Sequence, residues 1–372
     1  MRSARRGAAR TIGAVLAASF ALFLLGVAGL ALYRRPLQAD LAARTAIRSS
    51  AGIESLERID VRGDRQWIFL RGEKRSAPIL FVLHGGPGSP QLPLTRHFDG
   101  GLVRHFIVAH WDQPGAGKSL GWGVRPSRLT IERYVEDALV VVEQLRSRFG
   151  RSRVVLLGHS WGTVVGSYAV ARRPDLFSAW VSVGTDVIPA QAEEIGYRWV
   201  LGRARTAGHR EAIDALEEVG PPPYENLLEV QTERDWLEVF GGGGSHRPER
   251  EPGTLARALA SPEYTSLDSV RLLLGNVIGS AALFWDYLES VDLIEQVPRL
   301  EVPVFFLQGR HDYNTPGELV ERYYEVLAAP RGKQLVWFEE SAHRPHLEEP
   351  EEFARVLVER VLPLAESGPA AR

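Results

Sequence analysis

An α/β fold is the architecture that this sequence predicts: a mostly parallel, doubly wound sheet with an inserted helical cap, preceded by one N-terminal transmembrane helix. Three observations predict it. Short apolar runs alternate with amphipathic stretches in residues 53–185 and 298–365, and such alternation gives a parallel sheet with helices on both faces. The strand pattern disappears from 186 to 297, where helical stretches indicate the cap. An uncharged, mostly apolar run spans residues 11–33.

The expected elements follow in chain order. Residues 53–71 predict a hairpin that turns at Arg62-Gly63-Asp64. Thr130 can cap a helix that ends at Gly150, because the apolar residues between them recur at helical spacing. Apolar runs of strand length predict the remaining strands at 78–83, 106–111, 154–157, 178–183, 303–309 and 334–338.

The pentapeptide Gly158-His159-Ser160-Trp161-Gly162 lies between an expected strand and an amphipathic stretch. A tight strand–turn–helix connection needs glycine on both sides of the serine, because a Cβ there would clash. The turn exposes the Ser160 hydroxyl at its tip and points the Trp161 N–H to where an oxyanion would form. Ser160 is therefore the expected nucleophile.

A serine hydroxyl needs a base to take its proton and an acid to orient that base. In a doubly wound hydrolase both partners come after the serine, each in a loop that follows a later strand. Asp312 follows the expected strand 303–309, and His343 follows the expected strand 334–338. We assign Asp312 as the orienting acid and His343 as the base.

Other residues compete for these two roles. Glu339 and Glu340 also follow a strand, but they come too early to lie beside the imidazole. His346 falls at the expected start of the last helix, where it would be a surface or capping residue. His311 is expected to line solvent beside the acid, and His159 to point into the core next to the sheet.

The glycine-rich turn His84-Gly85-Gly86-Pro87-Gly88 follows the expected strand 78–83. Such a turn leaves backbone N–H groups unobstructed, so Gly86 is the first choice for the second oxyanion donor and Gly85 the next. A plain tight turn is the alternative. The loop 112–119 follows another strand, but its glycine spacing differs from that of a phosphate-binding loop. We expect that loop to be structural.

Together these motifs resemble the α/β-hydrolase superfamily, and within it the proline iminopeptidase-like branch. The resemblance covers residues 53–364. It rests on the turn at 84–88, the loop 112–119, the pentapeptide at 158–162, the segment 309–316, and Ala342-His343 with Glu349-Pro350 after it. It implies the α/β-hydrolase fold with a helical cap, Ser160 as nucleophile with Asp312 and His343, and an oxyanion hole from the backbones of Gly86 and Trp161.

The chain departs from that family in two places. Pro114 stands where the family usually has arginine. Prolyl-specific members carry amine-binding glutamates in a tryptophan-rich cap segment, which has no residue-by-residue match here. The resemblance therefore implies the fold and the triad more strongly than cleavage after an N-terminal proline.

The cap carries aromatic residues, most of which we expect to pack, and acidic residues. An acid facing the pocket could bind a substrate amine, although carboxylates on helix surfaces are usually solvated. The candidates are Asp286, Glu289, Glu193, Glu194 and Glu229. The stretch 241–253 is rich in glycine and charge, and we expect it to be mobile, either as a flap over the entrance or as a solvated loop.

Composition excludes several kinds of partner and of catalytic site. The 372 residues carry a net charge of −2, so nothing indicates a nucleic-acid partner. The sequence has no cysteine, which excludes a thiol nucleophile, disulfides and a cysteine-ligated zinc site. A serine triad requires neither a metal nor an organic cofactor, and we expect none. The oligomeric state stays open.

The apolar run 11–33 follows four arginines and is closed by two more. It is long enough to cross a bilayer, which takes about 20 residues, whereas a cleaved signal usually has about 7–15 apolar residues. We expect a cytoplasmic stub and signal anchor at 1–36, a connector at 37–52 and a flexible tail at 366–372. The arginine balance places the catalytic domain outside the cytoplasmic membrane; secretion after signal cleavage is the alternative.

The sequence thus predicts a membrane-anchored serine hydrolase that works through an acyl-enzyme. Its substrate would be a small peptide with a free amino terminus or a carboxylic ester. A cap carboxylate facing the pocket would favour an aminopeptidase, and its absence an esterase. Epoxide hydrolases and dehalogenases of this fold use an aspartate nucleophile, so Ser160 argues against both. The non-enzyme alternative is a binding or sensor protein on a hydrolase scaffold.

Overall fold

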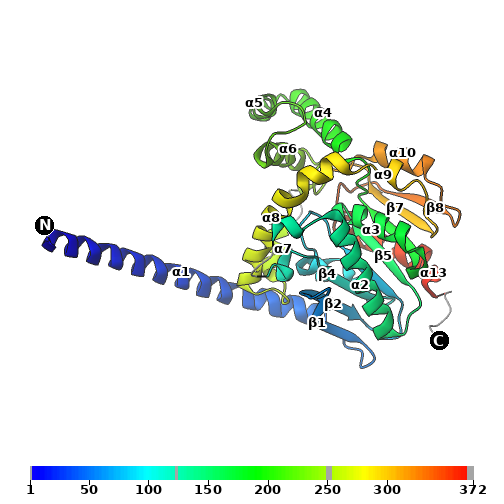
Figure 1. The fold of residues 1–372 in the computed structure, drawn as a ribbon, viewed down its shortest axis with the longest axis horizontal. Helices are drawn as coiled ribbons and strands as arrows, with labels where there is room; N and C mark the ends of the chain where they lie inside the picture. Colours follow the sequence, from blue (N-terminus) through cyan, green and yellow to red (C-terminus); the bar gives the residue numbers. More distant parts are fainter. Residues whose placement is uncertain (1, 122–124, 249–253, 367–372) are drawn as a thin grey trace.

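Eight strands form one sheet in the order β1-β2-β4-β3-β5-β6-β7-β8 in the computed structural model, which describes residues 2–121, 125–248 and 254–366 (Figure 1). β1 and β2 are antiparallel to each other, β2 is antiparallel to β4, and every later pair is parallel. The strands are β1 (Ile53–Val61), β2 (Asp64–Gly72), β3 (Ile79–Leu83), β4 (Ile107–Asp112), β5 (Val154–His159), β6 (Phe177–Val183), β7 (Val304–Gly309) and β8 (Lys333–Phe338). The predicted α/β-hydrolase sheet is confirmed.

The local signals in the sequence explain these elements. Arg62 and Gly63 both have positive φ, which is the backbone that a two-residue hairpin turn requires, and they join β1 to β2. The Thr130 side chain accepts a hydrogen bond from the Arg133 N–H and begins α2 (Ile131–Phe149). Gly150, in the left-handed region, ends that helix.

Alternate residues of the strands supply the two halves of the core. Ile79, Phe81 and Leu83 of β3 face one hydrophobic cluster, and Leu80 and Val82 face the other. The first cluster lies under α2, α3 (Trp161–Arg172) and α10 (Gly317–Val326). The second lies under α12 (Pro350–Val356) and the π-helical turn η7 (Leu357–Val361), which α13 (Leu362–Glu366) continues. Helices therefore cover both faces of the sheet.

The described residues between β6 and β7 form helices and no strand. They are α4 (Pro189–Ala207), α5 (Arg210–Val219), α6 (Leu227–Val239), α7 (Thr254–Ala260), α8 (Ser266–Ser290) and α9 (Leu293–Gln296). Gly208, which has a positive φ, ends α4 and separates it from α5. In Figure 1 α4, α5 and α6 form a lobe beyond the sheet, and α8 connects that lobe to the base of α1.

α1 (Arg2–Arg44) is a single helix that contains Pro36, so the expected connector is helical as far as Arg44. Its second half belongs to the body of the protein, because Arg34 and Leu41 are buried there. Its first half projects away from the body (Figure 1). Two helical segments, Ala18–Arg44 and Ser266–Ser290, are long and apolar enough to span a membrane by length and composition alone.

The stretch 241–253, expected to be mobile, is fixed in its described part. The Tyr313 N–H donates to the Gly242 carbonyl at 2.9 Å, and the His343 N–H donates to the Gly243 carbonyl at 3.2 Å. The Arg344 guanidinium donates to the Gly244 carbonyl at 2.7 Å. These bonds hold the segment against the loops that follow β7 and β8. Residues 249–253 lie outside the described residues.

Candidate active site

Ser160 occupies a strained turn between β5 and α3. Its φ of 54° and ψ of −126° are unusual for a residue with a side chain, and its N–H donates to the Val183 carbonyl of β6 at 3.0 Å. A Cβ on Gly162 would lie 2.4 Å from the Leu83 carbonyl oxygen, so only glycine allows this approach of α3 to β3. The pentapeptide thus lifts Ser160 above the carboxyl end of the sheet.

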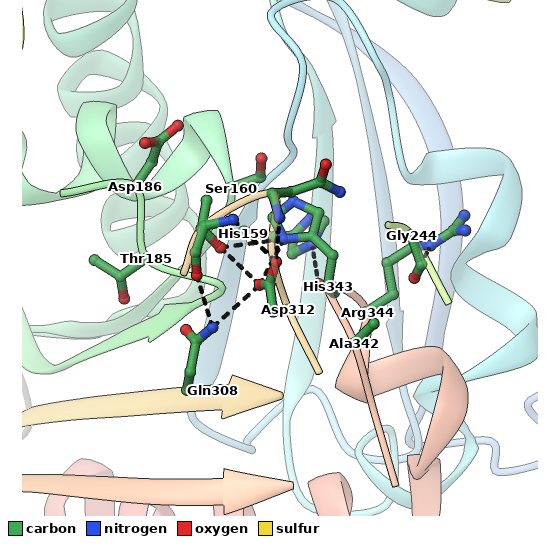
Figure 2. A network of polar contacts seen from close by, with 12 residues as sticks. His159, Ser160, Thr185, Asp186, Gly244, Gln308, Asp312, Ala342, His343 and Arg344 are labelled. Carbon is green, nitrogen blue, oxygen red and sulfur yellow. Dashed lines mark hydrogen bonds and ion pairs between the residues drawn. The ribbon is translucent and has the colours of Figure 1, made fainter. Parts of the chain in front are cut away.

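Asp312 and His343 meet beside this turn, at the ends of β7 and β8 (Figure 2). His343 Nδ1 lies 2.8 Å from Asp312 Oδ2, and the Asp312 side chain is fully buried. The Gly184 backbone separates the pair from β6, since a Cβ there would lie 3.0 Å from His343 Nδ1. Among the described residues no hydrogen bond joins the Ser160 hydroxyl to His343. Such bonds are often long without substrate.

Three further residues orient the Asp312 carboxylate, and the sequence interpretation assigned no role to them. The N–H groups of Asn314 and Thr315 donate to Oδ1 at 3.0 and 2.9 Å. The Thr315 hydroxyl and the Gln308 amide donate to Oδ2 at 2.6 and 3.1 Å. Gln308 is a buried polar residue at the end of an otherwise apolar strand, and that was the available signal.

The rival histidines support His343 and are themselves buried. His346, expected to be a surface or capping residue, is only 3% exposed. The Gln91 amide donates to His159 Nδ1 at 2.8 Å and to His346 Nε2 at 3.1 Å, which leaves His159 Nε2–H to donate to the His343 carbonyl at 2.9 Å. Burial holds the pKa of the His159 and His346 rings well below the ordinary value. Both rings are therefore neutral, and they support the loop that carries His343.

The remaining rivals lie away from the imidazole. His311 is half-buried and stacks on His246 with ring centroids 3.5 Å apart. Glu339 forms an exposed ion pair with Arg310 at 2.8 Å, and Glu340 pairs with Arg247. Neither carboxylate contacts His343 in the described structure.

Gly85 and Gly86 face the Ser160 turn from the other side. A Cβ on Gly85 would lie 3.1 Å from Ser160 Cβ, and Gly86 has a φ of +121°. The N–H of Trp161, in the first turn of α3, has no partner within the helix. The loop after β3 and the start of α3 therefore flank the serine, as a two-donor oxyanion hole requires.

Gln113 connects the turn after β3 to the start of α3 through hydrogen bonds to His84 and Trp161. Its N–H donates to His84 Nε2 at 3.1 Å, and its side-chain amide donates to the His84 carbonyl at 2.9 Å. Its side-chain oxygen accepts from the Trp161 indole at 3.1 Å. Burial lowers the pKa of His84 to about 4, so the ring stays neutral and can accept the Gln113 N–H. The loop 112–119 thus has the structural role expected of it.

Among the described residues, four of the five acidic candidates make no hydrogen bond or ion pair with Ser160, Asp312 or His343. Asp286, Glu289 and Glu194 are exposed. Glu229 accepts hydrogen bonds from the Glu225 N–H and the Asn226 side chain, and so caps the start of α6. The fifth, Glu193 of α4, is buried.

Glu193 belongs to a buried acidic cluster that also contains Glu233 of α6 and Asp186 from the loop after β6. Arg234 pairs with Glu193. Neither oxygen of Glu233 has a hydrogen-bond partner among the described residues, nor do Asp186 Oδ1 and Glu193 Oε2. Burial raises the pKa of Asp186 to about 8, with Glu193 adding to the effect, and holds that of Glu233 well above its ordinary value. The sequence alone assigns no role to Glu233 or Asp186.

Two hydrogen-bonded chains connect this cluster to the candidate triad. The Arg234 guanidinium donates to Asn314 Oδ1 at 2.7 Å, and the Asn314 N–H in turn holds Asp312. The Asp186 N–H donates to Thr163 Oγ1 at 3.0 Å, and that hydroxyl donates to the Ser160 carbonyl at 2.6 Å. Figure 2 shows Asp186 and Ser160 on neighbouring loops at the same edge of the sheet. The acidic cluster is therefore linked to the candidate site through Asn314 and Thr163.

The part of the chain that the structure describes contains no cluster of three or more histidine or acidic side chains arranged to hold a metal ion.

Comparisons with known proteins agree with this architecture. A family model described as alpha/beta hydrolase fold matches residues 78–215. A probable aminopeptidase of Bacillus subtilis (strain 168), YbaC, is 30% identical over 313 residues, which cover 84% of this chain and 97% of that protein. A proline iminopeptidase of Heyndrickxia coagulans is 30% identical over 306 residues, covering 80% and 96%. Both similarities extend over almost the whole relative.

Similarity to one solved structure supports the fold and nothing beyond it. A membrane phospholipase A, described as a bacterial virulence factor, superposes with a TM-score of 0.61 at 20% identity and covers 93% of this chain and 97% of its own. The similarity thus extends over most of the length of both chains.

Proposed function

We propose, from the premise that this chain belongs to the α/β-hydrolase superfamily and to its proline iminopeptidase-like branch, that it is a serine hydrolase acting on peptides with a free amino terminus. The observation that carries the proposal is the 2.8 Å contact of Asp312 with His343 beside the strained Ser160 turn, with the buried acidic cluster next to it.

In the proposed mechanism His343 takes the Ser160 proton while Oγ attacks the substrate carbonyl. Asp312 orients the imidazole and stabilises its protonated form. The oxyanion accepts hydrogen bonds from the N–H groups of Gly86 and Trp161, with Gly85 as the other donor candidate. His343 then gives the proton to the leaving group, and a water that it activates releases the acyl group from Ser160. No step uses a cofactor.

The cluster of Asp186, Glu193 and Glu233 supports a free amine as the substrate's other anchor. When all three carboxylates are ionised they share one cation among the described residues, Arg234, and the cluster then lacks positive charge. A substrate ammonium supplies that charge and donates three hydrogen bonds, which the unpartnered oxygens of this cluster can accept. Glu193 was a candidate from sequence, and the fold adds the other two.

An ester hydrolase is the alternative, and the Glu193–Arg234 pair is the observation that favours it. With that pair formed and with Asp186 and Glu233 protonated, the cluster is neutral without any amine. A neutral cluster would place no demand for charge on the substrate. A binding protein on a hydrolase scaffold is the non-enzyme alternative.

The proposal is tested with the full chain in detergent, because the second half of α1 packs into the body. Alanine and proline arylamides, their N-acetylated forms and short-chain acyl esters are compared on the parent and on Ser160→Ala. We expect arylamide turnover that needs both Ser160 and a free amino group. Ester turnover alone would favour the esterase, and equal activity of Ser160→Ala would exclude the mechanism.

The acidic cluster has its own test. Glu233→Gln keeps the shape of the side chain and removes its ability to ionise, and Glu194→Gln is the matched control because it lies exposed on α4. We expect Glu233→Gln to raise KM for free-amine substrates by about 10-fold or more, as for loss of a charged hydrogen bond, and to leave ester turnover unchanged. An equal effect on both substrate classes would contradict the amine site.

We further propose that α1 is retained as a membrane anchor, with the catalytic body outside the cytoplasmic membrane. The uncharged run 11–33 and its continuity with the docked half of the helix support this. The mass of the mature protein tests it, since removal of the apolar run would indicate a cleaved signal.

A further inference from the structure

One face of α8 is apolar and exposed. Leu267, Val270, Leu273, Leu274 and Val277 are each about half or more exposed, from 49% to 63%. Leu255 of the preceding α7 is 48% exposed. Scattered apolar residues on a surface are normal, but a contiguous row on one helix marks an interaction surface. We call these five residues of α8 the outer face.

The outer face is opposite the side of α8 that packs on the body. With about 100° per residue, its five side chains fall within an arc of about 120°, and the buried Leu272, Gly275 and Gly279 lie on the far side of the helix. Asp268 and Arg271, the charged residues between 266 and 280, pair with each other at 3.0 Å. The outer face therefore carries no unpaired charge, as insertion among lipids requires.

α1 is held directly at the start of α8. The buried Arg34 guanidinium donates to the carbonyls of Leu259 and Tyr264 at 2.8 and 2.7 Å, and to the hydroxyl of Ser266 at 3.2 Å. The Gln38 amide donates to the carbonyls of Ser261 and Tyr264 at 2.7 and 3.1 Å. These bonds tie the helix to the α7–α8 connection.

No linker separates the apolar part of α1 from this junction. The apolar run ends at Tyr33, and the next residue, Arg34, contacts the first residue of α8. One helical residue rises about 1.5 Å, so the edge of a bilayer crossed by α1 would lie within a turn of Ser266. Figure 1 shows α8 running crosswise to α1 at the side of the body from which α1 projects. A helix crosswise to the anchor lies along the membrane plane.

We propose that the outer face of α8 lies in the interface of the membrane that α1 crosses, as an in-plane helix of the cap. The inference rests on the proposed anchor but concerns a different surface. The occupant is lipid, because an apolar helix lying along the plane of a bilayer, next to the point where the chain enters it, meets headgroups and acyl chains first.

This contact would reach the candidate active site through the opposite side of α8. The backbones of Gly275 and Gly88 touch, since a Cβ on Gly88 would lie 2.2 Å from the Gly275 carbonyl oxygen. A Cβ on Gly279 would lie 2.9 Å from the Pro87 carbonyl. α8 thus lies between the proposed membrane surface and the turn at 84–88.

The absence of cysteine allows a direct test. Single-cysteine variants Leu273→Cys and Val277→Cys of the full chain receive an environment-sensitive fluorophore and are reconstituted into vesicles of phosphatidylcholine and phosphatidylglycerol with nitroxide lipids. Val326→Cys on α10, 56% exposed, is the matched control away from this surface. Leu25→Cys, in the apolar half of α1, reports the anchor separately.

We expect lipid quenching at 273 and 277 to exceed that at 326 by about threefold or more, as for a helix seated in the interface. Quenching at 273 and 277 equal to that at 326 would overturn the inference, whatever Leu25→Cys shows. Quenching at 273 and 277 without quenching at 25 would support the α8 contact and overturn the anchor. A blue shift at 277 that depends on protein concentration, without lipid quenching, would identify a second copy as the occupant and overturn the inference. Arylamide turnover measured on the same variants reports the proposed hydrolase function independently.

Discussion

The backbone carbonyl of Gly243, in the cap, accepts a 3.2 Å hydrogen bond from the backbone N–H of His343. The helical insertion therefore holds the loop of the proposed base directly. The neighbouring bond from Arg344 to the Gly244 carbonyl strengthens this link (Figure 2). The position of the imidazole thus depends on the insertion as well as on the sheet.

Gly243→Ala should misplace His343. The added Cβ would lie 2.7 Å from the Glu238 N and 2.8 Å from its Cα, so the segment has to shift. We expect kcat to fall about 10- to 100-fold, because small displacements of a catalytic group have effects of this size. Steady-state kinetics check this against Gly202→Ala, whose Cβ meets no atom within 4 Å. Equal kcat in the two variants would show that the link does not matter.

Ser160→Gly should be more stable than Ser160→Ala. The backbone at 160 has a φ of 54° and a ψ of −126°, which glycine adopts without steric strain and alanine does not. We expect the free energy of unfolding to be about 1 kcal/mol higher for glycine, and both variants to be inactive. Urea unfolding with equal m-values measures the difference. A glycine variant no more stable than the alanine variant would mean that the turn stores no strain.

Binding of a free-amine substrate should depend on the ionisation of Asp186, whose pKa burial raises to about 8. Below that pH the carboxyl is protonated and attracts an ammonium weakly, so KM should fall as the pH rises from 6 towards 8. Above about 8 the substrate amine loses its own proton and KM should rise again.

The pH profile of KM for alanine arylamide, measured beside an ester, checks this. Asp186→Asn should flatten the acid side of the profile for the amine and leave the ester unchanged. An identical profile for the two substrates would separate Asp186 from amine binding.

The contribution of the buried His84 and His110 to stability should decline as the pH falls below 6.5, whereas buried acids with raised pKa, such as Asp186, act in the opposite direction. Burial lowers the pKa of His84 to about 4 and that of His110 to about 3, whereas in the unfolded chain both titrate near 6.5. Below 6.5 the unfolded state binds more protons, so stability is fully present above that pH and is lost progressively down to about 4 and 3.

Urea unfolding of the parent and of His110→Gln at a series of pH values isolates this contribution, which should amount to a few kcal/mol at pH 4. His110→Gln removes one of the two groups and should make the slope shallower. Equal slopes for the parent and for His110→Gln between pH 6.5 and 4 would indicate that this ring is not buried as a neutral group.

Local rules in the sequence determined the sheet and the expected nucleophile. Period and length of apolar runs predicted every strand of the core, and the glycines around Ser160 predicted its turn, because a backbone that close to β3 excludes any Cβ. Chain order after each strand was enough to nominate Asp312 and His343, because parallel strands end at one edge of the sheet.

Only the tertiary structure decided which acids gather beside the site. Glu193, Glu233 and Asp186 come from two helices and a loop, and no spacing in the sequence distinguishes the buried Glu193 from the exposed Glu194 next to it. It also showed His346 to be buried and the segment after α6 to be fixed. Whether an acidic side chain is buried, and which residues it contacts, depends on how helices distant in the chain pack. A local sequence pattern carries no information about those distant contacts.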